Sequence, residues 1–386
     1  MNYTAGYYDL KNQFDLSEST IRFSDSDISC HKFRFDSTFK FDIPFSNNKG
    51  LGNTNAILHY PDNDISENKS FIYTVFVPGT VTRFDKAILL LHGLNERNWL
   101  KYLMWAYHLA EHTKRPVILF PIAFHINRSP EEWSNPRVIN NCLTDRREHF
   151  GQEALSSLAN LALSERLSES PGRFVTSGLQ SAQDITMLIS NIQAGRHPLF
   201  FAGSSVDIFA YSIGAFLAQI LILSNQDDLY SDTRLFIFCG GALFDQMNGT
   251  SKLIMDKGAF DRLRHFYIDE LEGVLQRNPI LKKFFNETQL GVAFTTMLAK
   301  HSLQKYRENA FERMRDRIEV VALANDKVIP ARGAMEAFGP HAHIEVMDFP
   351  FDYSHEVPFP LMKDESSKTV DQCFETVFSK AASFFR

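Results

Sequence analysis

The sequence contains few cysteines and no long apolar segment. Its four cysteines, Cys30, Cys142, Cys239 and Cys373, are scattered, and no pair has the close spacing of a metal-ligand motif. We interpret them as unpaired thiols. The longest mainly apolar run, residues 213–223, is far shorter than the ~20 residues that a membrane-spanning helix needs. We therefore predict no membrane span.

Basic residues are not in excess. The chain has 40 Lys and Arg against 46 Asp and Glu, a formal net charge of −6, which argues against a nucleic-acid partner. The first residues, Met1–Asp9, show neither the basic nor the apolar segment of a secretory signal. We expect a cytoplasmic protein. These features leave its oligomeric state open.

Phenylalanine is abundant, with 35 residues in a chain of 386. Many of these residues lie in strand-like apolar segments, so we interpret most of them as core filling. The alternative is that some of them line an aromatic pocket for an acyl group, because ligand pockets are mostly apolar.

The most informative segment is Val206–Ile220, in which an apolar strand runs into Ser212 and continues as an apolar helix. Ala210 and Gly214 stand two residues before and after the serine. A sharp strand-to-helix turn strains the serine backbone and needs small neighbours, as in the G-x-S-x-G nucleophile elbow. Here Ala replaces the first Gly. The motif is short, so it needs support from an acid and a base elsewhere.

The acid is predicted at the end of the strand-like segment 317–325. Asp326 follows this β-branched run and precedes Lys-Val-Ile-Pro, a turn that can hold the carboxylate at the edge of the sheet. Asp348 and Asp352 are the alternatives. We prefer Asp326 because of its position after a buried strand.

The base is predicted after the next strand-like segment, 343–350. His355 follows this strand, whereas the alternatives His341 and His343 precede or begin it. An imidazole in that position can take a proton from the serine and pass it to a leaving group.

A further strand, Lys86–Leu91, ends in His92-Gly93-Leu94-Asn95. With this turn and the chain order Ser, Asp, His, the sequence from about residue 71 to 386 resembles the α/β-hydrolase superfamily. The resemblance implies that Ser212 is a nucleophile, His355 its base and Asp326 the residue that orients the base.

The same resemblance places the oxyanion hole. Its donors would be the backbone N–H groups of Ile213, directly after the nucleophile, and of Leu94. Four further residues are possible pocket residues, although a turn or simple packing would also explain them: His92, Gly93, Asn95 and Tyr211.

The fold class that we predict is α/β, with a mostly parallel central sheet flanked by helices. Residues 1–70 are expected to form a β-rich N-terminal extension, with period-two alternation at 32–36 and 39–42 indicating a hairpin. Residues 71–386 would form the hydrolase domain. That domain would carry an insertion at 124–200 and a helical cap at about 244–316.

One metal-like pattern occurs, the H-x-x-E-H of His108–His112. Its imidazoles would lie one helical turn apart, as zinc ligands do, but the sequence indicates no third ligand. We interpret these histidines as packed or solvated and predict no metal and no cofactor.

The predicted function is hydrolysis of an ester or related acyl bond of a small-molecule substrate through an acyl-serine. A serine peptidase or an acyltransferase would use the same three residues. A non-catalytic binding protein on a hydrolase fold is the third possibility. The sequence does not identify the natural substrate.

Overall fold

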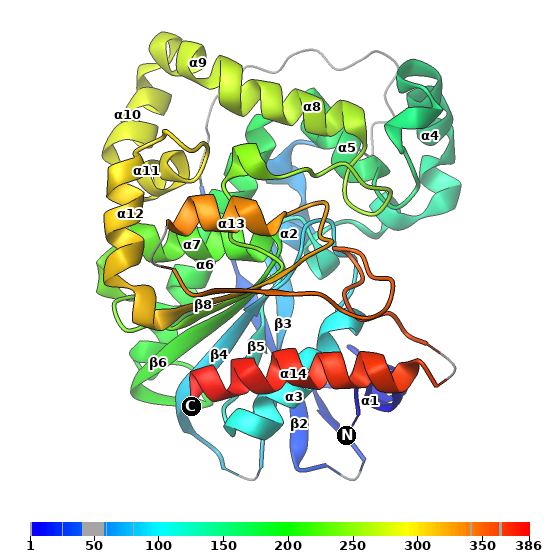
Figure 1. The fold of residues 1–386 in the computed structure, drawn as a ribbon, viewed down its shortest axis with the longest axis vertical. Helices are drawn as coiled ribbons and strands as arrows, with labels where there is room; N and C mark the ends of the chain where they lie inside the picture. The colour runs from blue at the N-terminus through cyan, green and yellow to red at the C-terminus, as the bar shows by residue number, and fades with distance from the viewer. Residues whose placement is uncertain are drawn as a thin grey trace.

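A nine-stranded mixed sheet forms the centre of the molecule (Figure 1). The computed structural model describes residues 2–24, 26–40, 58, 60–79, 81–339, 342–362 and 365–386. The strand order is β1-β2-β3-β5-β4-β6-β7-β8-β9. The strands are β1 (Thr20–Arg22), β2 (Ile28–Asp36), β3 (Ser70–Pro78), β4 (Phe84–Leu91), β5 (Val117–Leu119), β6 (Phe200–Tyr211), β7 (Leu235–Phe238), β8 (Ile318–Leu323) and β9 (Ile344–Met347).

Six neighbouring strands run parallel to one another, in the order β5, β4, β6, β7, β8 and β9. At the other edge of the sheet, β1, β2 and β3 pair antiparallel, and β3 also pairs antiparallel with β5. β4 and β7 are nearly continuous apolar runs, because helices cover both faces of the parallel part. The class of fold predicted from the sequence, α/β with a mostly parallel sheet, is confirmed.

Helices lie on both faces of the sheet. α1, α3 and α14 pack together on one face, and α6, α7 and α13 pack on the other (Figure 1). The helices are α1 (Tyr3–Gln13), α2 (Ser66–Lys69), α3 (Leu100–Thr113), α4 (Pro136–Phe150), α5 (Leu161–Glu169), α6 (Gly172–Gln193), α7 (Ile213–Ser224), α8 (Lys257–His265), α9 (Leu271–Arg277), α10 (Pro279–Glu287), α11 (Gln289–Thr296), α12 (Gln304–Arg313), α13 (Ala331–Phe338) and α14 (Ser367–Phe385).

Two helical insertions lie side by side at one end of the molecule (Figure 1). The first, between β5 and β6, contributes α4 and α5, and the second, between β7 and β8, contributes α8 and α9. A buried ion pair joins them, because Arg146 Nη2 donates to Asp256 Oδ1 at 2.8 Å. Asp256 also caps α8 by accepting from the Ala259 amide at 2.9 Å.

The first insertion differs in detail from the sequence prediction. The residue pattern of the insertion predicts a loop at 131–136 and a helix at 152–167. In the structure, α4 begins at Pro136 and most of 151–160 is not helical. Asn135 accepts from the Arg137 amide, and Pro136 occupies the first helical position, where its missing N–H costs nothing. This start signal was present in the sequence.

The N-terminal segment also differs from the prediction. It begins with α1, and the strand that contains residues 32–36 pairs with β1 and β3 rather than with residues 39–42. The described residues do not form the predicted hairpin: 39 and 40 belong to no strand, and 41 and 42 lie outside the described residues. The sequence also has turn-forming residues at 47–50, and these lie outside the described residues too. β2 finds a longer apolar partner in β3, which buries its inward-facing side chains.

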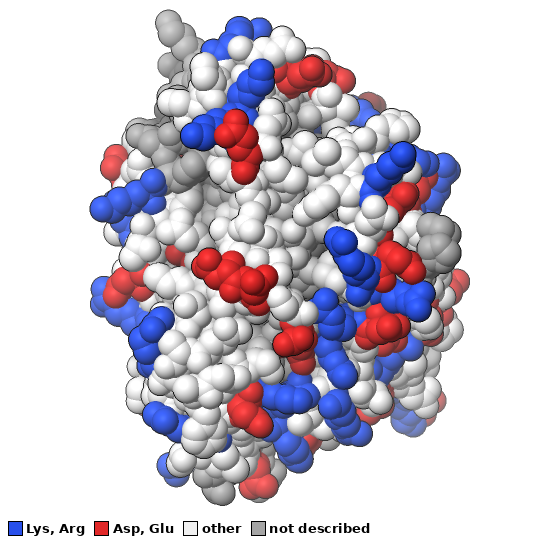
Figure 2. Space-filling view, turned by 90° about the vertical axis from the view of Figure 1, so that its left-hand side faces the viewer, with Lys and Arg blue, Asp and Glu red and all other residues white. Residues whose placement is uncertain are grey.

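Charged side chains of both signs are interspersed over the face in Figure 2, and its described residues form no extended patch of one sign. This distribution agrees with the small net charge of the chain. Within the described part of the chain, none of the helices combines the length and the apolar character that crossing a membrane requires.

Candidate active site

The turn between β6 and α7 holds Ser212 in a strained conformation, with φ 57° and ψ −123°. A non-glycine residue in such a region costs about 1–3 kcal/mol and persists only where the surroundings enforce it. Close packing around Gly214 is one of the contacts that hold this conformation. A Cβ at this position would lie 2.7 Å from the carbonyl oxygen of Leu91 and 2.8 Å from that of His92. The elbow is therefore packed directly against the end of β4.

Ser212, His355 and Asp326 form one chain of hydrogen bonds. Ser212 Oγ lies 2.6 Å from His355 Nε2, and His355 Nδ1 lies 2.7 Å from Asp326 Oδ2. A carboxylate can only accept, so Nδ1 carries the proton and Nε2 is left to accept from the serine hydroxyl. All three residues are at most 4% exposed, and they lie within one network although 143 positions separate Ser212 from His355.

The second carboxylate oxygen of Asp326 is fixed by the turn that follows it. Asp326 Oδ1 accepts from the amides of Val328 and Ile329 at 2.9 and 2.8 Å. Asp348, the other acid near the end of this part of the sheet, is occupied elsewhere, because its Oδ1 accepts from Asn325 and from Tyr353.

Three residues that the sequence also offered as acid or base take no part in this chain of hydrogen bonds. Asp352 and His343 are exposed, whereas Asp326 and His355 are buried. His341 lies outside the described residues. Among the described candidates, the structure therefore brings only Asp326 and His355 to Ser212.

Tyr211 holds the loop that carries the histidine. Its hydroxyl donates to the backbone oxygen of His355, and the two rings stack with centroids 5.5 Å apart and an interplanar angle of 16°. Burial raises the pKa of the Tyr211 hydroxyl well above its ordinary value, so this donor stays protonated.

The two predicted oxyanion donors face no competing acceptor. Among the described residues, neither the Leu94 N–H nor the Ile213 N–H donates a hydrogen bond, and Ile213 is the first residue of α7, where amides lack helical partners. The turn before Leu94 is fixed by a residue that the sequence did not reveal. The Gly93 amide donates to Tyr102 Oη at 2.9 Å, and that hydroxyl donates to Glu96 Oε1 at 2.7 Å.

His92 lies beneath this turn and not on a pocket wall, which corrects our prediction for it. Its side chain is fully buried, Nε2 accepts from the Ile122 amide at 2.9 Å, and Nδ1 donates to the Gly93 oxygen at 2.8 Å. Burial lowers the pKa of His92 to about 3, so the ring is neutral at physiological pH. His92 thus connects the turn after β4 to the loop after β5.

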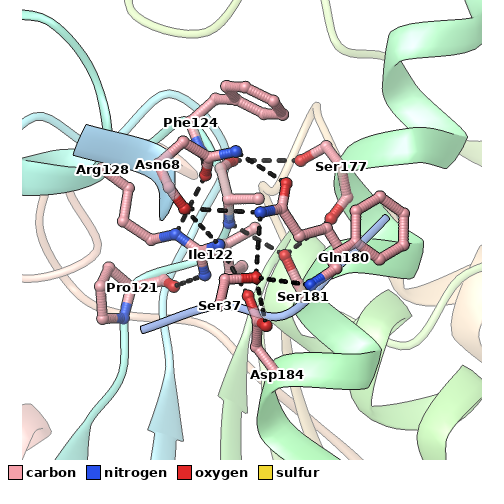
Figure 3. A network of polar contacts seen from close by, with 12 residues as sticks. Ser37, Asn68, Pro121, Ile122, Phe124, Arg128, Ser177, Gln180, Ser181 and Asp184 are labelled. Carbon is pink, nitrogen blue, oxygen red and sulfur yellow. Dashed lines mark hydrogen bonds and ion pairs between the residues drawn. The ribbon is translucent and has the colours of Figure 1, made fainter. Parts of the chain in front are cut away.

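A buried polar network holds that second loop in place (Figure 3). Arg128 and Asp184 form a fully buried ion pair at 2.8 Å, and Ser37 donates to the same carboxylate at 2.6 Å. The guanidinium lies 4.0 Å from the centre of the Phe71 ring and also donates to Asn68. Burial lowers the pKa of Arg128 to about 10 and raises that of Asp184.

The loop itself is fixed through three consecutive amides. The Ile122 amide donates to His92 Nε2 at 2.9 Å, and the Ala123 amide donates to Ser181 Oγ at 2.9 Å. The Phe124 amide donates to Asn68 Oδ1 at 3.1 Å. Arg128 adds a bond to the Pro121 oxygen at 3.0 Å. The network therefore reaches from the N-terminal segment to the turn that carries Leu94.

A cleft of about 260 Å³ opens in front of Ser212. We call it the serine cleft; it is lined by Gly93, Leu94, Asn95, Glu96, Arg97, Asn98, Lys101, Ala159, Tyr211, Ser212, Leu253, Ile254, His355, Glu356 and Val357. Gly93, Asn95 and Tyr211 thus lie where the sequence suggested. Asn95 also ties the turn to both insertions, because its Nδ2 donates to the oxygens of Ala159 and Leu253 at 2.8 and 2.7 Å.

Lys101 and Glu356 line this cleft and could not be found from the sequence. Lys101 pairs with Glu96 and lies 5.1 Å from the centre of the Tyr211 ring, and Ser251 donates to the Glu356 carboxylate. These residues come from separate segments with no motif of their own. Only the fold brings them to the cleft.

The two histidines of the H-x-x-E-H pattern lie on α3, and Glu375 on α14 lies beside them in space. His108, His112 and Glu375 offer ligand atoms within 4.8 Å of one another. However, a metal-bound imidazole donates its second N–H, and His108 Nδ1 is buried without a partner among the described residues. The geometry fits a hydrogen bond from His108 Nε2 to Glu375 Oε2, at 3.0 Å, better than a metal site.

The chain has a mostly parallel sheet and a strand–serine–helix turn. An aspartate and a histidine follow two later strands. Together these features define the α/β-hydrolase fold. The fold that the resemblance implies is therefore confirmed. The chain belongs to the Family of unknown function (DUF6051), whose model matches residues 1–386.

Solved structures with a similar course of the chain include several esterases. The esterase Est22 is 10% identical, with 99% of this chain and 87% of that chain covered and a TM-score of 0.46. Carboxyl esterase 2 of the mycorrhizal fungus Tuber melanosporum is 9% identical, with 99% and 96% covered and a TM-score of 0.45. Vibralactone cyclase is 10% identical, with 94% and 81% covered and a TM-score of 0.44. No curated protein matches the sequence.

Proposed function

We propose that the protein is a serine hydrolase that cleaves a carboxylic ester or a related acyl bond. The observation that carries the proposal is the continuous hydrogen-bond chain from Ser212 through His355 to Asp326, with Ser212 at a strained elbow. A serine hydroxyl becomes a useful nucleophile only when a base within hydrogen-bond reach can take its proton.

In the first half of the reaction, Ser212 Oγ attacks the carbonyl carbon and forms a C–O bond. The hydroxyl proton passes to His355 Nε2 and then to the oxygen of the leaving alcohol as its bond to the acyl carbon breaks. The Ile213 and Leu94 amides would bind the oxyanion, and Asp326 would stabilise the imidazolium. His92 and Tyr102 would act as positioning residues for the turn that carries Leu94.

In the second half, water takes the place of the alcohol. His355 accepts a proton from the water as its oxygen bonds to the acyl carbon, and returns that proton to Ser212 Oγ as the acyl-serine bond breaks. The products are the carboxylic acid and the free enzyme. The two helical insertions would form a cap over the cleft and limit access of bulk water.

The test is hydrolysis of p-nitrophenyl acetate by the wild type beside Ser212→Ala. We expect many turnovers per molecule for the wild type and a rate at the uncatalysed background for the variant, because no other nucleophile is placed at the elbow. A variant that retained the wild-type rate would contradict the proposal. Transfer of the acetyl group to an added alcohol faster than to water would identify an acyltransferase instead.

A further inference from the structure

Glu356 is a charged residue that directly follows His355 and lines the serine cleft with it. Its side chain is half-buried. Ser251 Oγ accepts from the Leu253 amide at 3.1 Å and donates its own proton to the Glu356 carboxylate. Because Ser251 belongs to the second helical insertion, that insertion holds the carboxylate at the wall of the cleft.

The Glu356 carboxyl is ionised at neutral pH. Burial raises its pKa, but the hydrogen bond from Ser251 and the neighbouring His355 act in the opposite direction, and the pKa lies below its ordinary value. Among the described residues, no Lys, Arg or His side chain forms an ion pair with this carboxylate. A partly buried charge without a partner of opposite sign costs free energy, so its presence at a cleft indicates a functional role.

The other charged groups of the serine cleft have partners within the protein. Lys101 pairs with Glu96. The Arg97 guanidinium is turned to the first insertion, where it donates to the Ala159 oxygen at 3.0 Å. Glu356 is therefore the charge in this cleft that a bound ligand could compensate.

The surroundings of Glu356 favour an organic cation over a metal ion. The described residues contain no group of three possible metal ligands that includes Glu356, whereas a calcium ion takes about six to eight oxygen ligands. Leu253 and Val357 line the same cleft and are 49% and 41% exposed. The alkyl groups of an ammonium ion can contact these apolar side chains while its charge faces the carboxylate.

The position of Glu356 indicates which half of an ester would carry the cation. In the proposed reaction, His355 Nε2 protonates the leaving oxygen, so the alcohol lies on the histidine side of the cleft. The carbonyl oxygen points instead to the Leu94 and Ile213 amides. Glu356 follows His355 and lines the same cleft, which places its carboxylate within reach of the alcohol.

We propose that Glu356 binds an ammonium group on the leaving alcohol, and that the substrate is an ester of a small cationic alcohol. The assignment rests on the proposed hydrolase function and names the substrate class of that same site. Glu356 would then be a specificity residue that touches the substrate without taking part in proton transfer.

The experiment compares kcat/KM for acetylcholine and for 3,3-dimethylbutyl acetate, with acid release followed in a pH-stat. The two esters share the acetyl group and have alcohols of nearly the same shape, but only one alcohol is charged. We expect the wild type to prefer acetylcholine by at least about tenfold, since opposite charges attract strongly in a partly desolvated cleft. Glu356→Gln retains an oxygen that can accept from Ser251 and should reduce this ratio at least about tenfold.

The matched control is Asp352→Asn, which removes the same charge from an exposed residue of the same loop that does not line the cleft. It should leave the ratio of the two kcat/KM values within about twofold of the wild type, because solvent and salt screen an exposed charge.

Three results would overturn the cation assignment and leave the hydrolase proposal intact. The wild type could show no preference for acetylcholine, or it could hydrolyse p-nitrophenyl acetate and neither of the two aliphatic esters. Glu356→Gln could also lose equally on both aliphatic esters, which would make Glu356 a partner of the His355 imidazolium instead. A folded wild type that hydrolyses none of the three esters would overturn both proposals.

Discussion

His355→Ala is expected to lower kcat/KM for a simple aryl ester by about 10⁴- to 10⁶-fold. Without the imidazole, the Ser212 hydroxyl has no acceptor for its proton, and the leaving group has no donor. The hydrogen bond that His355 accepts from Ser212 and the one that it donates to Asp326 are lost together, because one ring makes both. The measurement is the initial rate of p-nitrophenol release over a concentration series of the ester.

The matched control is His343→Ala. His343 precedes β9, is exposed, and was one of the candidate bases in the sequence. Its removal should leave kcat/KM within about twofold of the wild type, as for a surface residue remote from the site. If His355→Ala kept more than about a tenth of the activity while folding normally, His355 could not be the general base.

Arg128→Met is expected to lower the free energy of unfolding by about 3–5 kcal/mol. The substitution leaves the Asp184 carboxylate buried at 0% side-chain exposure without its guanidinium partner. It also removes bonds to Asn68 and to the Pro121 oxygen, which fix the loop whose Ile122 amide holds His92. Urea unfolding followed by circular dichroism measures the change.

Two comparisons make this prediction specific. Arg34→Met breaks an ion pair with Asp36 whose side chains are 70% and 69% exposed, so its unfolding midpoint should match that of the wild type. The double variant Arg128→Met/Asp184→Leu should be more stable than Arg128→Met alone, because no unpaired charge is left buried. A single variant as stable as Arg34→Met would refute the role given to the network.

The sequence revealed the parts of the site that obey local rules. Ser212 was found because a strained turn needs small neighbours, and the structure shows why Gly214 cannot carry a Cβ. Asp326 and His355 were found because the ends of parallel strands meet at one edge of the sheet. The roles of these residues, and of the Leu94 and Ile213 amides, stay predictions until activity is measured.

Other features depend on contacts between distant segments, which a periodic pattern does not encode. Tyr102 reaches the Gly93 amide from α3, and Glu375 reaches His108 from a helix 267 positions away. The alternation at residues 32–36 predicted a strand, but its partner could not be chosen locally, and β3 was the stronger competitor. His92 was a possible pocket residue in the sequence, whereas its ring is fully buried beneath the turn.

The most direct test of the central claim, that Ser212 is an activated nucleophile, is intact-mass and peptide analysis after treatment with a fluorophosphonate. This reagent forms an O–P bond with an activated serine as fluoride leaves, whatever the natural substrate. The wild type should gain one adduct on the peptide that contains Ser212, and Ser212→Ala should gain none. A folded wild type with no adduct, or with its adduct on another residue, would contradict the claim.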